Sequence, residues 1–372
     1  MHIGIPKEIK NHEYRVGLVP SGVAELVRRG HSVTVETAAG QGIGFSDDDY
    51  RQAGASIGES AEQVFAAADL IVKVKEPLEQ EWKMIRSDQT LFTYLHLAPA
   101  RDLTCALMDT GATCIAYETV TDSKGRLPLL APMSEVAGRM SVQAGAMSLE
   151  KSHGGKGVLL GGVPGVSQGR VLVLGGGVVG SNAVQMAVGL GANVTVLDRS
   201  PEVLARLDQQ YGNRIQTLYS TTDAVESAAL SADLIIGAVL VPGASAPRLI
   251  TKELVSAMEA GTVMVDVAID QGGCFETSHP TTHADPTYLV DEVVHYCVAN
   301  MPGAVPRTST LALNNVTLPY VLELADKGVM EALAQNDHLR EGLNVCRGQV
   351  TNREVGEAHG LDYTDPRQLL VA

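Results

Sequence analysis

The sequence predicts an α/β fold of two doubly wound, parallel-sheet (Rossmann-like) domains that flank a cleft and are joined by long helices. Short apolar runs alternate with helical patterns in two successive series along the 372 residues, which is typical of parallel sheets with helical crossovers. The 38 glycines suit the tight turns of such folds. A chain of this length exceeds one ordinary hydrophobic core, so two domains are expected.

The first domain is expected to comprise residues 1–128 and 307–372. Period-2 apolar runs predict strands at 2–6, 32–36, 70–74, 90–95 and 113–117, and helical spacing predicts helices at 21–30 and near 60–67, 79–86 and 100–110. The tail from residue 329 reads as helical and polar, and we expect it to pack back on this domain.

The second domain is expected at residues 129–306. A turn-rich linker at 122–135 precedes a long helix that should run from Ser134, as its N-cap, to about Lys151. Strands are predicted at 170–175, 193–198, 215–220, 233–239 and 262–268, with a sixth at 293–298. A long helix at 308–328 then leaves the domain.

Composition narrows the class of partner. Hydrophobic residues make up 45% and charged residues 19% of the chain, and the net charge of −15 disfavours nucleic acid and anionic membranes as partners. Five cysteines without a C-x-x-C pair argue against a disulfide framework or a zinc site and suit a reducing compartment. No apolar run reaches about 18 residues, and the N-terminus lacks an apolar signal segment. A cytoplasmic protein is expected.

The stretch "VLVLGGGVVG" (171–180) predicts a dinucleotide site. An apolar strand runs into Gly175-x-Gly177-x-x-Gly180, a helical pattern follows, and Asp198 ends the next strand. The glycines allow a tight turn, a close backbone approach to a pyrophosphate and close helix packing. Asp198 would accept hydrogen bonds from ribose hydroxyls and repel a 2′-phosphate, which favours NAD, although the neighbouring Arg199 weakens that preference. The alternative is a glycine turn without a ligand.

Three basic residues of the first domain lie at or after the ends of predicted strands, where parallel sheets bind ligands. Arg15 lies in the loop after the first strand, and its planar guanidinium suits a carboxylate. The alternative for Arg15 is a solvated surface arginine. Lys73 and Lys75 close the strand at 70–74 on one face, and either could bind an anion or extend along the surface to water.

His96 and Asp270 are candidate proton-transfer and electrostatic groups. His96 follows Phe92 and Tyr94 on one strand face and precedes Pro99. Histidine exchanges protons near neutral pH, and the alternative is a core histidine with a satisfied ring. Asp270 lies in the loop of "TVMVDVAIDQGG", where the alternative is a turn or cap residue.

Several ordered motifs resemble one family. The segments "GIPKEIKNHEYRVGLVP", "IVKVKEP", "YLHLA", "GGVPGV", "VLGGGVVG", "DVAIDQGGCFE" and "VANMPGAVPRTST" together resemble bacterial alanine dehydrogenases over about residues 1–330. The opening motif is also similar to the related α subunit of nicotinamide nucleotide transhydrogenase. The resemblance implies NAD-dependent oxidative deamination of L-alanine to pyruvate and ammonia, the reverse amination, and a homohexamer.

The resemblance also implies roles for residues. His96 would be the acid/base, Asp270 a second catalytic group, and Arg15 and Lys75, rather than Lys73, the substrate ligands. The implied cofactor contacts are Ser134, Gly175, Gly177, Val178, Val179, Gly180, Asp198, Ser220, Val239, Leu240, Val267, Ala268, Ile269, Asp270, Val298, Ala299, Asn300 and Met301.

The sequence departs from the family pattern at three positions. Val203 and His279 stand where family members often carry a basic residue and an arginine, which puts two NAD contacts in doubt. Lys327 stands where some members pair a histidine with Glu323 to hold a metal, and a protonated lysine cannot replace that ligand, so no metal is expected.

Two rival functions remain in view. A transhydrogenase α-subunit-like protein would bind NAD and dock on a membrane partner. A non-catalytic NAD-binding protein would keep the glycines without needing Arg15, Lys75, His96 and Asp270. Since the acid/base would come from one domain and NAD from the other, we also expect the cleft to close for hydride transfer.

Overall fold

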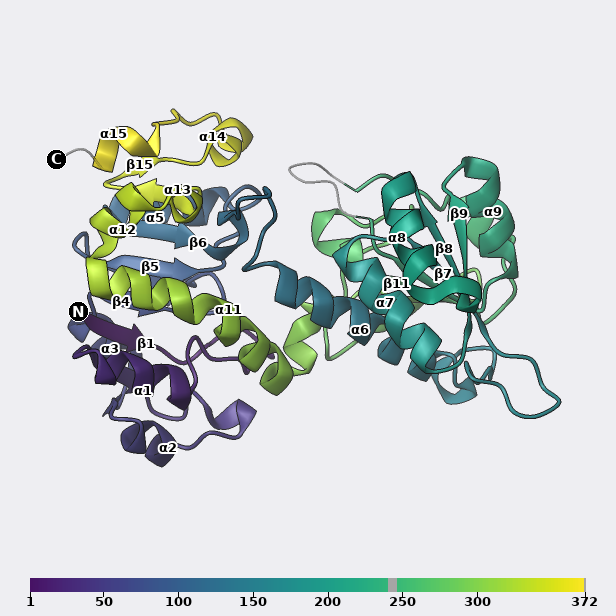
Figure 1. Cartoon of the computed structure of the whole chain (residues 1–372), viewed down its shortest axis with the longest axis horizontal. Helices are drawn as coiled ribbons and strands as arrows, with labels where there is room; N and C mark the ends of the chain where they lie inside the picture. Colours follow the sequence, from purple (N-terminus) through teal and green to yellow (C-terminus); the bar gives the residue numbers. More distant parts are fainter. Residues whose placement is uncertain (240–245, 371–372) are drawn as a thin grey trace. The chain divides into compact units, whose positions relative to one another are not determined.

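The computed structural model describes residues 1–239 and 246–370, and the chain divides into two compact units. Unit 1 consists of Met1–Met133 and Val305–Ala372, and unit 2 of Ser134–Ala304. Each unit has a mainly parallel sheet with flanking helices (Figure 1), so the predicted α/β class is confirmed. Among the described helices, none has the length and hydropathy needed to span a bilayer.

The sheet of unit 1 runs in the order β15-β14-β6-β5-β4-β1-β2-β3. Strands β1 to β6 are parallel to one another. At one edge β14 pairs antiparallel with β6, and β15 pairs antiparallel with β14. The strand order reverses between β1 and β4, which is where doubly wound sheets bind ligands. The strands are β1 (His2–Ile5), β2 (Ser32–Glu36), β3 (Ser56–Gly58), β4 (Leu70–Val72), β5 (Thr90–Thr93), β6 (Thr113–Ala116), β14 (Leu343–Cys346) and β15 (Gln349–Val350).

Helices connect these strands and complete unit 1. They are α1 (Pro20–Arg28), α2 (Asp47–Gln52), α3 (Ala61–Ala67), α4 (Glu79–Trp82), α5 (Arg101–Thr110), α11 (Pro306–Lys327), α12 (Val329–Gln335), α13 (Asp337–Arg340), α14 (Arg353–His359) and α15 (Pro366–Leu370). The long helix predicted at 308–328 is thus present as α11. It anchors the chain after β1, since Val16 and Val19 donate backbone N–H groups to the Thr310 hydroxyl and the Asn314 side chain.

The sheet of unit 2 runs in the order β12-β13-β11-β10-β7-β8-β9 and reverses between β7 and β10. Only β12 is antiparallel, at one edge. The strands are β7 (Arg170–Leu174), β8 (Asn193–Asp198), β9 (Ile215–Tyr219), β10 (Leu234–Gly237), β11 (Val263–Asp266), β12 (Thr287–Val290) and β13 (Val293–Tyr296). The helices are α6 (Ala131–Ser148), which begins in unit 1, α7 (Val178–Gly189), α8 (Pro201–Tyr211), α9 (Thr222–Ser231) and α10 (Lys252–Ser256).

The prediction of a helical, polar tail was wrong in one part. Helices α12 to α15 are present, but β14 lies antiparallel to β6, and its Leu343, Val345 and Cys346 are buried. A two-residue turn returns the chain to β15, with Arg347 at φ 50° and Gly348 at φ 77°. Positive φ at both central residues is typical of a type I′ hairpin turn, but Arg-Gly is not one of the pairs that predict such a turn from sequence.

Several predicted boundaries also need correction: the strands predicted at 233–239, 262–268 and 293–298 are the shorter β10, β11 and β13. Ser134 is not an N-cap but lies within α6, which begins at Ala131 and carries Pro132 in its first turn, where proline is favoured. The strand predicted at 70–74 ends at Val72, because the Glu8 carboxylate accepts the backbone N–H of Val74 at 2.7 Å. The strand predicted at 90–95 ends at Thr93.

The core of unit 1 contains one hydroxyl without a partner. Tyr117 is fully buried, and its ring meets Phe92 and Tyr94 edge-on at centroid distances of 4.4 and 5.1 Å. Within the described residues its hydroxyl oxygen has no hydrogen-bond partner. Tyr50 is equally buried, but its hydroxyl donates to the Leu18 carbonyl at 2.9 Å.

We therefore expect Tyr117→Phe to raise the free energy of unfolding by about 1 kcal/mol, because it removes an unsatisfied buried polar group. The matched control Tyr50→Phe should lower it by about 1 kcal/mol, because it breaks a satisfied hydrogen bond. Urea unfolding of both variants would measure the difference. An equal loss of stability in both would contradict the prediction and indicate a water bound to the Tyr117 hydroxyl.

Candidate functional site

Arg15 is held at the carboxyl end of the unit 1 sheet, in the loop after β1. It is 2% exposed, so it is not a solvated surface arginine. Its Nε and Nη2 donate to the two carboxylate oxygens of Glu13 at 2.7 and 2.6 Å, and Nη1 faces the Met133 sulfur at 3.1 Å. Glu13 thus fixes one edge of the guanidinium, and Nη1 lies against the Met133 sulfur.

The structure separates the two lysines after β4. Lys73 is fully buried, and its ammonium group donates to Glu8 at 3.1 Å and to Glu81 at 2.6 Å. Lys75 keeps an 11% exposed side chain and a single longer ion pair, to the adjacent Glu76 at 3.4 Å. The Lys73 ammonium is paired with two carboxylates inside the fold, so Lys73 has a structural role. The Lys75 ammonium has one longer ion pair among the described residues, so it could bind an additional anion.

His96 lies just beyond β5 and is exposed, which excludes the alternative of a core histidine. Its ring stacks on Tyr94 at a centroid distance of 5.8 Å and an angle of 11°. Its backbone has φ 49°, in the left-handed region that L-residues rarely adopt. The Glu118 carboxylate accepts the backbone N–H groups of Leu95 and His96, the latter at 2.6 Å, and so holds this conformation.

Glu76 lies among the basic groups of this edge, and the sequence analysis did not single it out. Its Oε1 accepts from Lys10, while its buried Oε2 lacks a hydrogen-bond partner among the described residues and lies beside Lys75. Burial would raise the pKa of Glu76, but Lys75, Lys10 and His96 together hold that pKa below its usual value. Lys75 and His96 therefore share one electrostatic neighbourhood.

Tyr94 lies near Arg15 and also stacks on His96, so Arg15 belongs to the same group of residues. Its hydroxyl donates to the Leu129 carbonyl at 2.5 Å. Burial raises the pKa of Tyr94, with Arg15 opposing the rise and Glu118 adding to it. The structure thus brings Arg15, Lys75 and His96 together in unit 1 around Tyr94, Glu76 and Glu118. The carboxylates that organise them were missed, because acidic residues next to basic ones read as ordinary surface pairs in a sequence.

The glycine-rich turn of unit 2 has the geometry that a dinucleotide needs. Gly175 has φ 94°, and a Cβ on it would lie 2.9 Å from the Ala238 carbonyl. A Cβ on Gly180 would lie 1.7 Å from the Gly175 carbonyl, so only glycine lets α7 approach β7. A Cβ on Gly177 would meet no atom of the described residues within 4 Å, and this glycine precedes the start of α7, where free N–H groups attract phosphate.

Asp198 ends β8 beside that turn. Its two carboxylate oxygens accept the backbone N–H groups of Gly176 at 2.6 Å and Ser200 at 2.7 Å. A carboxylate has about four acceptor sites, so two remain for ribose hydroxyls. Arg206, which the sequence analysis missed, donates to the Gly176 carbonyl and to the Ser181 hydroxyl, both at 2.9 Å, and braces the turn.

The remaining predicted cofactor contacts all lie in unit 2, and they divide by exposure. Ile269, Val298 and Met301 are at most 4% exposed, so their side chains belong to the core. Leu240 lies outside the described residues. The more accessible residues are Ser134, Val178, Val179, Ser220, Val239, Val267, Ala268, Ala299 and Asn300.

Asp266 and Asp270 have different environments. Asp266 is fully buried and caps the short helix η5 (Val267–Gln271) by accepting the N–H of Ala268 at 3.1 Å. Asp270 is exposed near the end of η5, two residues before the Gly272-Gly273 turn. The cap predicted as an alternative for Asp270 is therefore made by Asp266.

The departures from the family pattern have local partners of their own. The His279 ring stacks on Tyr288 at a centroid distance of 3.6 Å, and its backbone N–H donates to the Tyr288 hydroxyl at 2.9 Å. Val203 lies in the first turn of α8, where its N–H donates to the Ser200 hydroxyl. Val203 also packs against the glycine turn, since a Cβ on Gly176 would lie 2.6 Å from it.

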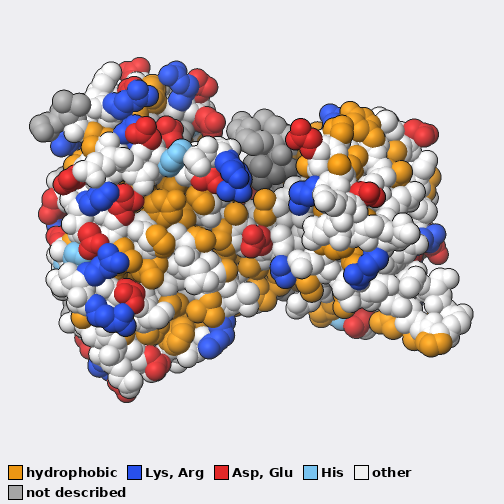
Figure 2. Space-filling model, in the orientation of Figure 1, with side chains coloured by type: hydrophobic (Ala, Val, Ile, Leu, Met, Phe, Trp, Pro, Cys, Tyr) orange, Lys and Arg blue, Asp and Glu red, His pale blue; other side chains and the backbone are white. Residues whose placement is uncertain are grey.

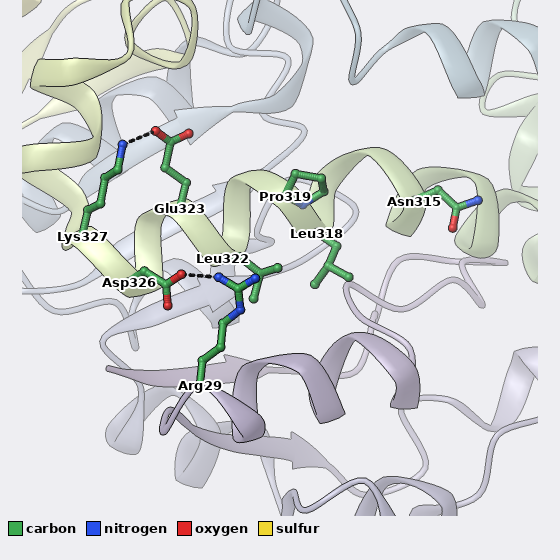
Figure 3. A pocket seen from close by; sticks show the side chains of 8 residues that line it. All are labelled: Arg29, Asn315, Leu318, Pro319, Leu322, Glu323, Asp326 and Lys327. Atoms are coloured by element: carbon green, nitrogen blue, oxygen red, sulfur yellow. Dashed lines mark hydrogen bonds and ion pairs between the residues drawn. The ribbon is translucent and has the colours of Figure 1, made fainter.

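A groove of about 560 Å³ follows α11 on the surface of unit 1 (Figure 3). Leu318 and Leu322 line it, and the ion pairs Arg29–Asp326 and Lys327–Glu323 flank them. In Figure 2, hydrophobic side chains gather on this part of unit 1, between interspersed acidic and basic groups.

Lys327 donates to Glu323 at 3.0 Å, and the described residues hold no cluster of three metal-binding side chains.

The fold and the glycine turn define a two-domain dinucleotide-binding oxidoreductase. The model of the alanine dehydrogenase/PNT N-terminal domain matches residues 4–137, and that of the C-terminal domain matches residues 141–353. The chain belongs to the alanine dehydrogenase/PNT family.

Curated relatives match along their full length. The chain is 62% identical over 370 residues to the alanine dehydrogenase of Halomonas elongata and 55% identical over 370 residues to that of Mycolicibacterium smegmatis, with 100% of both chains covered in each case. Alanine dehydrogenase 2 of Staphylococcus aureus is 55% identical over 371 residues, also with full coverage of both chains.

Solved structures agree. An L-alanine dehydrogenase superposes with a TM-score of 0.94 at 56% identity, covering 97% of this chain and 99% of that one. The transhydrogenase of Sinorhizobium meliloti gives a TM-score of 0.81 at 24% identity, covering 95% of this chain and 99% of that one, which shows a shared fold.

The glycine turn yields a test that separates packing from ligand contact. Gly180→Ala should lower the free energy of unfolding by about 1–3 kcal/mol, because its Cβ would overlap the Gly175 carbonyl. Gly177→Ala should leave stability unchanged but weaken NAD binding roughly 10-fold, because its Cβ would lie at the start of α7, where the phosphates are expected.

Calorimetric titration with NADH and thermal unfolding of both variants would measure the two effects. A Gly177→Ala variant that binds NADH as tightly as the unmodified chain would show that the phosphates do not lie against this turn.

Proposed function

We propose that the chain catalyses the NAD-dependent oxidative deamination of L-alanine to pyruvate and ammonia, and the reverse amination. The full-length identity of 62% to a curated alanine dehydrogenase carries this proposal. The alternative, a transhydrogenase α-subunit-like role, has weaker support, since the identity to a transhydrogenase is 24%. The non-catalytic alternative is disfavoured because buried carboxylates organise Arg15 and Lys75 at a single sheet edge.

Arg15 and Lys75 would bind the substrate. The carboxylate of alanine or pyruvate fits the Nη1 side of Arg15, because Glu13 occupies the opposite edge of the guanidinium. The Lys75 ammonium, with one ion pair at 3.4 Å, would polarise the keto oxygen. Lys75, Lys10 and His96 hold the pKa of Glu76 below its usual value, so Glu76 keeps a negative charge beside the Lys75 ammonium.

His96 would move the proton. In deamination, hydride leaves the alanine Cα and an iminium forms; water then adds to that carbon while His96 accepts a proton from the water. His96 next returns that proton to the carbinolamine nitrogen; it then accepts the hydroxyl proton as the C=O bond forms and the C–N bond breaks, which releases pyruvate and ammonia. The exposed ring, fixed against Tyr94, suits this exchange.

NAD supplies the hydride acceptor in deamination, and NADH the donor in amination. Gly175, Gly177 and Gly180 would hold its pyrophosphate and Asp198 its adenosine ribose, and the accessible members of the predicted contact set would line the rest. Asp270, exposed at the end of η5, would orient the water or the substrate amine electrostatically.

The assembly state belongs to the same proposal. By its similarity to the family, the chain would form a homohexamer, and light scattering coupled to size exclusion would measure its mass. The cytoplasmic location expected from the composition stays a prediction.

The activity has a direct test. Protein, NAD and L-alanine should produce NADH absorbance at 340 nm, and pyruvate, ammonium and NADH should consume it. His96→Ala should lower kcat by roughly 10²–10⁴-fold, the usual contribution of a general acid/base.

His153, a half-exposed histidine of unit 2, provides the matched control, and His153→Ala should keep the activity. A folded His96→Ala variant as fast as the unmodified chain would remove His96 from the mechanism. No turnover of either substrate set would remove the proposed reaction itself.

A further inference from the structure

The Asp266 carboxylate accepts hydrogen bonds from several groups of the segment that follows β11. Asp266 is fully buried. Its Oδ1 accepts from the Ala268 N–H at 3.1 Å and the Cys274 thiol at 3.5 Å. Its Oδ2 accepts from the N–H groups of Cys274 at 2.9 Å and Phe275 at 3.3 Å, and from the Ser278 hydroxyl at 2.6 Å.

Because these donors occupy its acceptor sites, the Asp266 carboxylate does not bind substrate or cofactor directly. A carboxylate offers about four acceptor sites, and five donors already approach this one. Burial raises the pKa of Asp266, although hydrogen bonds from Ser278 and Cys274 oppose the rise. A buried carboxylate of this kind costs free energy unless such bonds are retained, so the loop must keep the conformation that supplies them.

The same bonds hold both ends of the segment that carries Asp270. Ala268 lies before Asp270 in η5, and Cys274 and Phe275 lie after it. The intervening turn is shaped to the carboxylate, since Gly273 has φ 77° and a Cβ on it would lie 2.6 Å from Asp266 Oδ2. The exposed Asp270 is therefore held between two points that one buried group fixes.

We propose that Asp266 is a positioning residue, which holds η5 and the following turn so that Asp270 keeps its working geometry. This inference rests on the proposed function, because it acts through Asp270. Small displacements of a reacting group lower turnover strongly, so Asp266 affects kcat without touching substrate or cofactor.

A double-mutant cycle tests this inference. Asp266→Asn places an amide N–H₂ against N–H donors and should lower kcat for L-alanine oxidation about 10-fold or more, with KM for L-alanine changed less than about 2-fold. In an Asp270→Asn background the same substitution should change kcat less than about 2-fold, because the positioned group is already gone. Equal factors in both backgrounds would overturn the proposal.

Two further variants keep the test decisive. Ser278→Ala removes one donor and leaves the carboxylate; it should give a smaller loss of kcat that also disappears in the Asp270→Asn background, and it decides the question if Asp266→Asn does not fold. Asp233→Asn alters another buried acid of unit 2, which accepts from Arg170 and Lys156. Its effect on kcat should be the same factor in both backgrounds.

The outcome for Asp270 itself is separate. If Asp270→Asn alone is as active as the unmodified chain, the proposed role of Asp270 fails. If Asp270→Asn loses activity but Asp266→Asn lowers kcat by the same factor in both backgrounds, only the positioning role of Asp266 is refuted.

Discussion

The buried ion group of Glu8, Lys73 and Glu81 is the constraint on which the candidate site of unit 1 depends. Lys73 is fully buried between the two carboxylates, and removing one partner of such a group leaves an uncompensated charge that costs about 3–5 kcal/mol. Glu8 also accepts the backbone N–H groups of Val74 and Lys75, which ends β4. Glu8 therefore pairs with Lys73 and also sets the backbone conformation that places Lys75 at the candidate site.

The same design recurs at both candidate sites: carboxylates with no proposed chemical role hold the groups for which such a role is proposed. Glu13 fixes the guanidinium of Arg15, Glu118 fixes the backbone of His96, and Asp266 fixes the segment around Asp270. Hydrogen bonds from backbone N–H groups to a charged carboxylate are stronger than neutral ones. Acidic side chains can therefore hold irregular backbone, such as the left-handed His96, after a regular strand has ended.

The fold was largely predictable, because apolar strands and helical spacing report burial directly. Strands β7, β8 and β13 and helix α11 follow from their own residues. β14 could not be predicted so easily, because its four residues gain their strand character from pairing with β6 about 230 positions earlier. The glycine turn was predictable because its spacing is local. The partners of Arg15, Lys75 and His96 were not, since a pattern does not say which of several neighbouring carboxylates is buried.

The position of β14 has a consequence for biosynthesis. Unit 2 is one continuous segment, whereas unit 1 is assembled from both ends of the chain. Strand β6 is made early, but its outer backbone groups stay unpaired until residues 343–346 leave the ribosome, and an unpaired strand edge invites association with other chains. During synthesis the uninterrupted unit 2 can finish folding first, whereas the sheet of unit 1 keeps an open edge until β14 has been made.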